Sequence, residues 1–227
     1  MAQGTQDAIA VADGWDGIVD DWSADKQTFP VHWGKAMMWI FLLSDTFIFG
    51  CFLTSYMTVR MSTPVPWPIP SEVFALSFGG QPIPLILIAI MTFILISSSG
   101  TMAMAVNFSY RRDKKKIFWL MVATAAFGAS FVGMQAFEWT KLIVEEGVRP
   151  WSNPMGAAQF GSSFFMITGF HGMHVSAGVI YLLIVANRVR TGFYDRKGSY
   201  DTVEIAGLYW HFVDLVWVFI FAFFYLW

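Results

Sequence analysis

The stretch GLYWHFVDLVWVFIFAFFYLW, residues 207–227, decides the fold. It is almost entirely apolar and has about the 20 residues that a helix needs to cross the hydrocarbon core of a bilayer. Two ionisable residues, His211 and Asp214, nevertheless lie inside it, three positions apart. The stretch therefore predicts a membrane-spanning helix whose two polar side chains need partners.

The composition of the whole chain agrees with a membrane protein. Hydrophobic residues make up 56% of the 227 residues and charged residues only 13%, which is far from the balance of a soluble domain. A net charge of -2 and the lack of a basic, aromatic surface segment argue against a nucleic-acid partner. Because Cys51 is the only cysteine, the chain forms no intramolecular disulfide and no Cys-x-x-Cys metal site.

Five apolar stretches are long enough to span a membrane, so we predict an all-α bundle of five transmembrane helices. Before them, residues 1–32 are acidic and lack an apolar run, which indicates an N-terminal arm outside the membrane and not a signal peptide. Residues 33–227 form the membrane domain. The predicted spans are 33–59, 83–108, 117–141, 160–187 and 205–227.

The basic residues predict the orientation of the bundle. If the helices alternate, all but three of the 14 Lys and Arg residues lie on the side of the N-terminal arm. The three exceptions are Arg60, Lys141 and Arg149. By the positive-inside rule the N-terminus is cytoplasmic and the C-terminus is periplasmic.

The ionisable residues inside the spans are the candidate functional residues, because such side chains face protein or a water-filled cavity. His171 and His174 share one helix face, and Glu204 shares the face of the final helix with His211 and Asp214. The candidates are Asp45, Glu138, His171, His174, His211 and Asp214, together with Glu204 just before the final span.

Three interpretations of these residues stay open on the residues alone. They can be hydrogen-bonding groups between helices. His171 and His174, with carboxylates on facing helices, can bind a metal or haem. Asp45, near the middle of its span, is the best candidate for a proton pathway. No nucleophile elbow, P-loop or dinucleotide motif occurs, so catalysis of the soluble type is not expected.

Four of the helices carry motifs of a known family. The final two predicted spans contain SSFFMITGFHGMHVSAGVIYL and EIAGLYWHFVDLVWVFIF, and together they resemble the closing helices of subunit III of the haem-copper oxidases. LLSDTFIFGCFLTSY resembles the acidic helix of that family, and FVGMQAFEWTKLI resembles its Gln-x-x-Glu helix. The resemblance covers about residues 33–227.

The resemblance implies a non-catalytic role in a proton-pumping terminal oxidase of a bacterial inner membrane. Subunit III of that family binds no haem and no copper, packs on subunit I, holds structural phospholipid and supports proton uptake. Reduction of dioxygen to water belongs to subunits I and II, and a larger respiratory assembly is a further expected partner. The ionisable residues are then expected to form a buried polar network without metal ligands: Glu138, His171, His174, Glu204, His211 and Asp214.

Two departures from the mitochondrial pattern bear on the electron donor. The chain has room for five helices instead of seven, and the missing pair would be the first two, so the lipid cleft between that pair and the other helices does not carry over to this chain. Asp45 stands where the mitochondrial type has Glu, as in related quinol oxidases, whereas Tyr209 and Val213 resemble the cytochrome c oxidases. We expect a cytochrome c oxidase, with a quinol oxidase as the alternative and a stand-alone proton-coupled carrier as the alternative from another class.

Overall fold

The structure, a computed structural model, describes residues 32–78 and 81–226. Apart from His32, the predicted N-terminal arm at residues 1–32 lies outside the described residues. All five predicted membrane helices are present, and each is long and apolar enough to cross a bilayer. They are α2 (Trp33–Ser62), α4 (Ile86–Tyr110), α5 (Lys114–Val144), α6 (Ala158–Arg190) and α8 (Asp201–Phe221), which continues as the π-helical segment η2 (Ala222–Leu226).

The helix ends differ from the predicted spans for local reasons. The second span was predicted from residue 83, but Ile83 and Pro84 belong to a strand, and α4 begins only after Leu85, whose φ is 58°. The other helices extend beyond their apolar runs into charged residues. At the start of α5, for example, the Asp113 side chain accepts a hydrogen bond from the backbone N–H of Lys116. Such an N-cap lets the helix begin at Lys114, before the apolar run does.

The long connection after α2 carries the small elements of the fold. Prolines at 64, 66, 68 and 70 stop helical continuation because they lack a backbone N–H. The connection then forms α3 (Pro70–Val73) and a hairpin of β1 (Ala75–Phe78) and β2 (Gln81–Pro84), in which Ala75 pairs with Pro84. The sequence pattern predicted helices only, so this two-stranded hairpin outside the helical bundle was not predicted.

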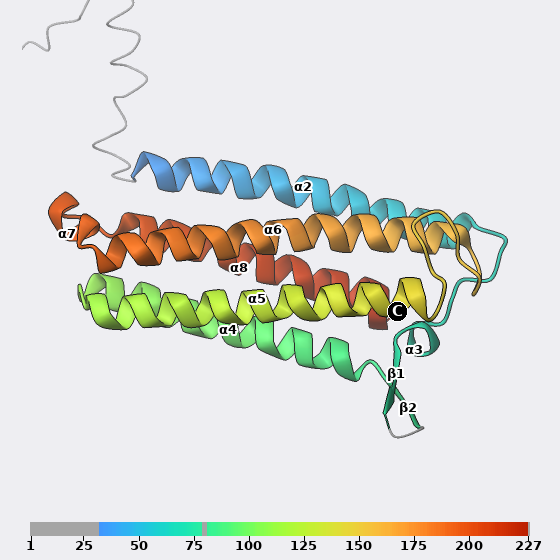
Figure 1. Cartoon of the computed structure of the whole chain (residues 1–227). Coiled ribbons are helices and arrows are strands. Elements are labelled where there is room, and N and C mark those ends of the chain that lie inside the picture. The colour runs from blue at the N-terminus through green and yellow to red at the C-terminus, as the bar shows by residue number, and fades with distance from the viewer. Residues whose placement is uncertain (1–31, 79–80, 227) are drawn as a thin grey trace, which may run out of the picture.

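The five helices alternate in direction, as predicted (Figure 1). The hairpin, α3 and the C-terminus lie at one end of the bundle. The start of α2, the turn between α4 and α5, and the short helix α7 (Phe193–Lys197) lie at the other end (Figure 1). One end of the bundle therefore holds most of the basic residues of the described chain (Figure 1).

Helix α8 contacts three other helices through one large side chain. It packs against α2, α4 and α6, while α5 packs between α4 and α6. The buried indole of Trp210 lies against Gly128 on α5 and Gly178 on α6, where an added Cβ would come within 2.4 Å and 3.0 Å of the ring. Its Nε1 donates to Ser98 Oγ on α4 at 2.9 Å. Trp210 therefore joins α4, α5, α6 and α8 at one level.

Candidate functional site

Asp45 on α2 faces His174 on α6. One carboxylate oxygen lies 3.3 Å from His174 Nε2, and the two side chains are only 4% and 12% exposed. The other imidazole nitrogen, Nδ1, contacts the carbonyl oxygen of Phe170 at 2.8 Å, which fixes the ring orientation. The sequence alone does not show this partner, because it comes from another helix.

His171, one turn before His174, has a different environment. It is 1% exposed and its ring stacks on Trp217 of α8, with centroids 5.4 Å apart and planes at 27°. The edge-on ring of Phe131 contacts it from α5, and its two nitrogens find no hydrogen-bond partner among the described residues. His171 therefore acts as an aromatic packing residue in this bundle.

Glu138 forms a third contact group, near the C-terminal end of α5. Gln135 Nε2 donates to one of its carboxylate oxygens at 2.8 Å, and the hydroxyl of Tyr225 lies 3.2 Å from both oxygens. Tyr225 comes from η2, and both residues are almost fully buried. The group fastens the C-terminal segment of the described chain to α5.

His211 and Asp214 do not reach Glu138 or the α6 histidines. Both contact Ser99 on α4: the Ser99 hydroxyl donates to Asp214 Oδ2 at 2.6 Å, and His211 Nδ1 lies 3.3 Å from Ser99 Oγ. His211 is exposed on the surface of the bundle, and Asp214 is partly exposed. The prediction that His211 is buried is therefore wrong, whereas Asp214 is partly buried against α4.

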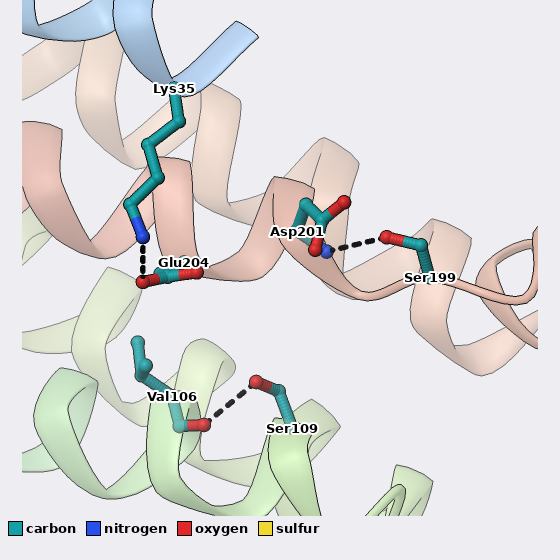
Figure 2. A network of polar contacts seen from close by, with 6 residues as sticks. All are labelled: Lys35, Val106, Ser109, Ser199, Asp201 and Glu204. Atoms are coloured by element: carbon teal, nitrogen blue, oxygen red, sulfur yellow. Dashed lines mark hydrogen bonds and ion pairs between the residues drawn. The ribbon is translucent and has the colours of Figure 1, made fainter. Parts of the chain in front are cut away.

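Glu204 pairs with Lys35 at the end of the bundle that carries α7, joining the start of α8 to the start of α2 (Figure 2). Nearby, the backbone N–H of Asp201 bonds Ser199 Oγ at 3.2 Å (Figure 2). A polar pocket of about 320 Å³ lies here, with Tyr110 and Arg112 also in its wall. This ion pair is part-exposed, so it orients the two helix ends and adds little stability.

At the same end, Asp195 in α7 binds two partners. It forms an ion pair with Lys114 at the start of α5 and accepts a hydrogen bond from the Tyr200 hydroxyl. The Lys114 contact, followed by the Tyr200 bond, lowers the pKa of Asp195 below its ordinary value. Burial and the adjacent Asp195 carboxylate raise the pKa of Tyr200 to about 12.

The predicted polar residues thus form separate groups and not one network. Asp45 pairs with His174, Glu204 with Lys35, and His211 and Asp214 with Ser99, while Glu138 and His171 each have their own surroundings. Within the described residues, no three His, Cys, Asp or Glu side chains lie close enough together to hold a metal ion.

Sequence reasoning missed the hydroxyl and aromatic partners that complete these groups. Trp217 Nε1 donates to Thr92 Oγ1 at 3.0 Å, a second bond between α8 and α4 beside that of Trp210. The run SSSGT at residues 97–101 was a signal for close helix packing. It did not show which hydroxyl meets which helix, because that depends on helix rotation.

The fold and its polar contacts define a multi-pass membrane protein, and comparison with known proteins gives its family. A family model described as cytochrome c oxidase subunit III matches residues 12–227. Among similar curated proteins, a probable quinol oxidase subunit 3 from Staphylococcus aureus (strain USA300) is 31% identical over 198 residues, covering 87% of this chain and 90% of the relative. A protein of the same name from Staphylococcus epidermidis is 32% identical over 200 residues.

The chain therefore belongs to the subunit III family of the haem-copper oxidases, as the motifs predicted. Membership makes it a component of an oxidase, with other oxidase subunits as partners.

Proposed function

We propose that the chain is the non-catalytic subunit III of a proton-pumping quinol oxidase in a bacterial cytoplasmic membrane, with its N-terminus on the cytoplasmic side. The contacts of its ionisable side chains support this role best. Asp45, Glu138 and His174 each engage a side chain of the same bundle, as expected of residues that hold helices together in lipid.

The two histidines of α6 are poorly placed to bind haem iron or copper. Such a ligand needs a free ring nitrogen directed at a common site. His171 is enclosed by Trp217 and Phe131, and both nitrogens of His174 already have contacts. We therefore assign haem and copper, and with them the reduction of dioxygen to water, to partner subunits I and II.

The choice of quinol over cytochrome c departs from the expectation based on Tyr209 and Val213. The curated relatives are named quinol oxidase subunit 3. The Tyr209 hydroxyl donates to the carbonyl oxygen of His174 at 3.0 Å, and Val213 is 2% exposed. Both residues take part in helix packing, so neither residue indicates which electron donor the oxidase uses.

Support of proton uptake and retention of structural phospholipid are also part of the proposal. Both follow from the family resemblance, and Asp45 is the residue assigned to them. A place for the oxidase in a larger respiratory assembly is compatible with this role.

Oxygen uptake by the complex purified through a tag on this chain tests the proposal. We expect rapid uptake with a reduced short-chain quinol and none above background with reduced cytochrome c. Uptake with cytochrome c alone would assign the protein to the cytochrome c oxidases. No uptake with either donor, from a preparation free of haem, would favour the stand-alone carrier.

A further inference from the structure

His211 differs from the other ionisable residues at mid-membrane depth. Asp45 and His171 are each 3% exposed or less, and His174 and Asp214 are partly buried. Among the Asp, Glu, Lys, Arg and His residues in the central turns of the five described spans, His211 alone is exposed on the outer surface. The bundle thus covers its other central ionisable groups wholly or in part and leaves this one outside.

His211 also lies well inside its span, away from both ends. It is the eleventh residue of the span Asp201–Leu226, so about 15 Å of helix separates it from the nearer end. Its contact Ser99 is the fourteenth residue of the 25-residue helix α4, which gives a similar depth. Long Lys and Arg side chains can extend to the membrane interface, but an imidazole is too short to do so.

The hydrogen bonds around Ser99 define what His211 presents outward. Ser99 has one hydroxyl proton, and it donates this proton to Asp214. The contact between His211 Nδ1 and Ser99 Oγ therefore requires that Nδ1 carries the imidazole proton. In a neutral imidazole, Nε2 is then an acceptor, and no partner for it is found in the described part of the chain.

A groove adjoins His211 between α2 and α8. It has a volume of about 340 Å³ and an almost wholly apolar lining. The lining includes Trp39, Leu43, Leu208 and Leu215 together with His211. Apolar side chains from a neighbouring helix can fill this groove while a polar side chain reaches the imidazole.

We propose that this face of α8, centred on His211, is the contact surface for a membrane helix of another subunit of the oxidase. That helix places a hydrogen-bond donor, such as a hydroxyl, amide or basic group, against His211 Nε2. Lipid tails cannot supply such a donor, whereas a protein helix can. The proposal rests on the proposed function and adds the surface and the chemistry of the partner.

A photo-crosslinking residue at Leu215 tests the surface in the intact complex, with Met173 as the matched control. Leu215 on α8 and Met173 on α6 are 56% and 57% exposed, and both lie near the middle of their helices. We expect Leu215 to capture a different oxidase subunit and Met173 to capture lipid or nothing. Capture of a subunit from Met173 and only lipid from Leu215 would overturn the proposal, as would capture of a second copy of this chain from Leu215.

Substitution of His211 tests the hydrogen bond. A bond between membrane helices is worth about 1–2 kcal/mol, so His211→Leu should weaken retention of the partner subunits on detergent dilution by about 5- to 30-fold. His211→Gln keeps an acceptor and should retain more partner than the Leu variant, while Met173→Leu should match the unmodified protein. Equal retention by the Leu and Gln variants would contradict the assigned hydrogen bond.

Haem content separates this inference from the proposed function. If haem co-purifies with the tagged chain but crosslinks form only from Met173, the surface is wrong and the role in the oxidase stands. If no haem protein co-purifies with the unmodified chain, the proposed function itself is wrong, and the inference that rests on it is wrong as well.

Discussion

At the scale of single residues, the indole of Trp210 depends on the absence of side chains at two glycines. An added Cβ at Gly128 would lie 2.4 Å from one Trp210 ring carbon and 2.9 Å from another. Val179 would also be too close, at 2.8 Å. The ring is held by its bond to Ser98 and is fully buried, so it has little freedom to move aside.

We therefore predict that Gly128→Ala lowers the stability of the bundle by about 1–3 kcal/mol, which is typical of overpacking. The matched control is Gly133→Ala on the same helix, where an added Cβ meets nothing within 4 Å. Because Ala has a higher helix propensity than Gly, the control should be neutral or slightly stabilising. Thermal unfolding of both purified variants measures the difference, and equal melting temperatures would show that the Trp210 contact is not tight.

Asp45 and His174 supply a second prediction. Asp45→Asn should leave the initial rate of oxygen reduction nearly unchanged and shorten the time for which the oxidase survives turnover. Because the two side chains are in contact, Asp45→Asn and His174→Gln should be non-additive, with a coupling of about 0.5–3 kcal/mol in stability. Additive effects of the two substitutions would contradict the pairing. Immediate loss of all oxygen reduction in Asp45→Asn would contradict the supporting role.

Sequence reasoning identified these polar residues but only some of their contacts. The spacing of His171 and His174 correctly places them on one side of α6. Three residues nevertheless turn a helix by 300°, so the two rings point 60° apart, one toward Trp217 of α8 and one toward Asp45 of α2. Partners on other helices depend on helix rotation and depth, which the order of residues within one helix does not determine.

At the scale of elements, the connection between α6 and α8 is fixed to the start of α5 by Asp195. This carboxylate contacts Lys114 and Tyr200, which come from different parts of the chain. Its lowered pKa means that the folded protein prefers the ionised form. The stabilisation is therefore fully present above the unfolded pKa, about 3.9, and is lost as the pH falls through the lower folded pKa.

The third prediction follows from the lowered pKa of Asp195. Asp195→Asn should lower the melting temperature at pH 6–7, and the difference from the unmodified protein should shrink as the pH falls below about 4 toward the folded pKa. Lys114→Gln should have the same effect, and the double variant should add little to either single one. A difference in melting temperature that is constant from pH 7 to pH 3 would show that the charge of Asp195 is not responsible.

The helices themselves were predictable because each apolar run is long enough for a membrane, and this signal is independent of tertiary contacts. Their ends were less predictable. Charged residues such as Lys114 and Asp201 continue a helix beyond its apolar run, while Ile83 is apolar yet pairs in a hairpin. Hydropathy alone cannot separate an apolar strand in a loop from the first turn of a helix.

At the scale of the whole molecule, the polar contacts account for how five helices stay together in lipid. The apolar surface of the bundle gives no net hydrophobic drive for association there, so close packing and interhelical hydrogen bonds have to supply it. Bonds from α8 to α4, through Trp210 and Trp217, and the contact of α2 with α6 do so at several depths. As a member of the oxidase subunit III family, the chain also has other oxidase subunits as partners.

The optical spectrum and metal content of the gently purified protein test the central claim most directly. The tagged chain is isolated first with its partners and then alone, after dissociation in stronger detergent. An accessory subunit III predicts haem and copper in the complex and neither in the isolated, still folded chain. Haem or copper bound stoichiometrically to the isolated chain would contradict the account, and so would a stable preparation that never associates with a haem protein.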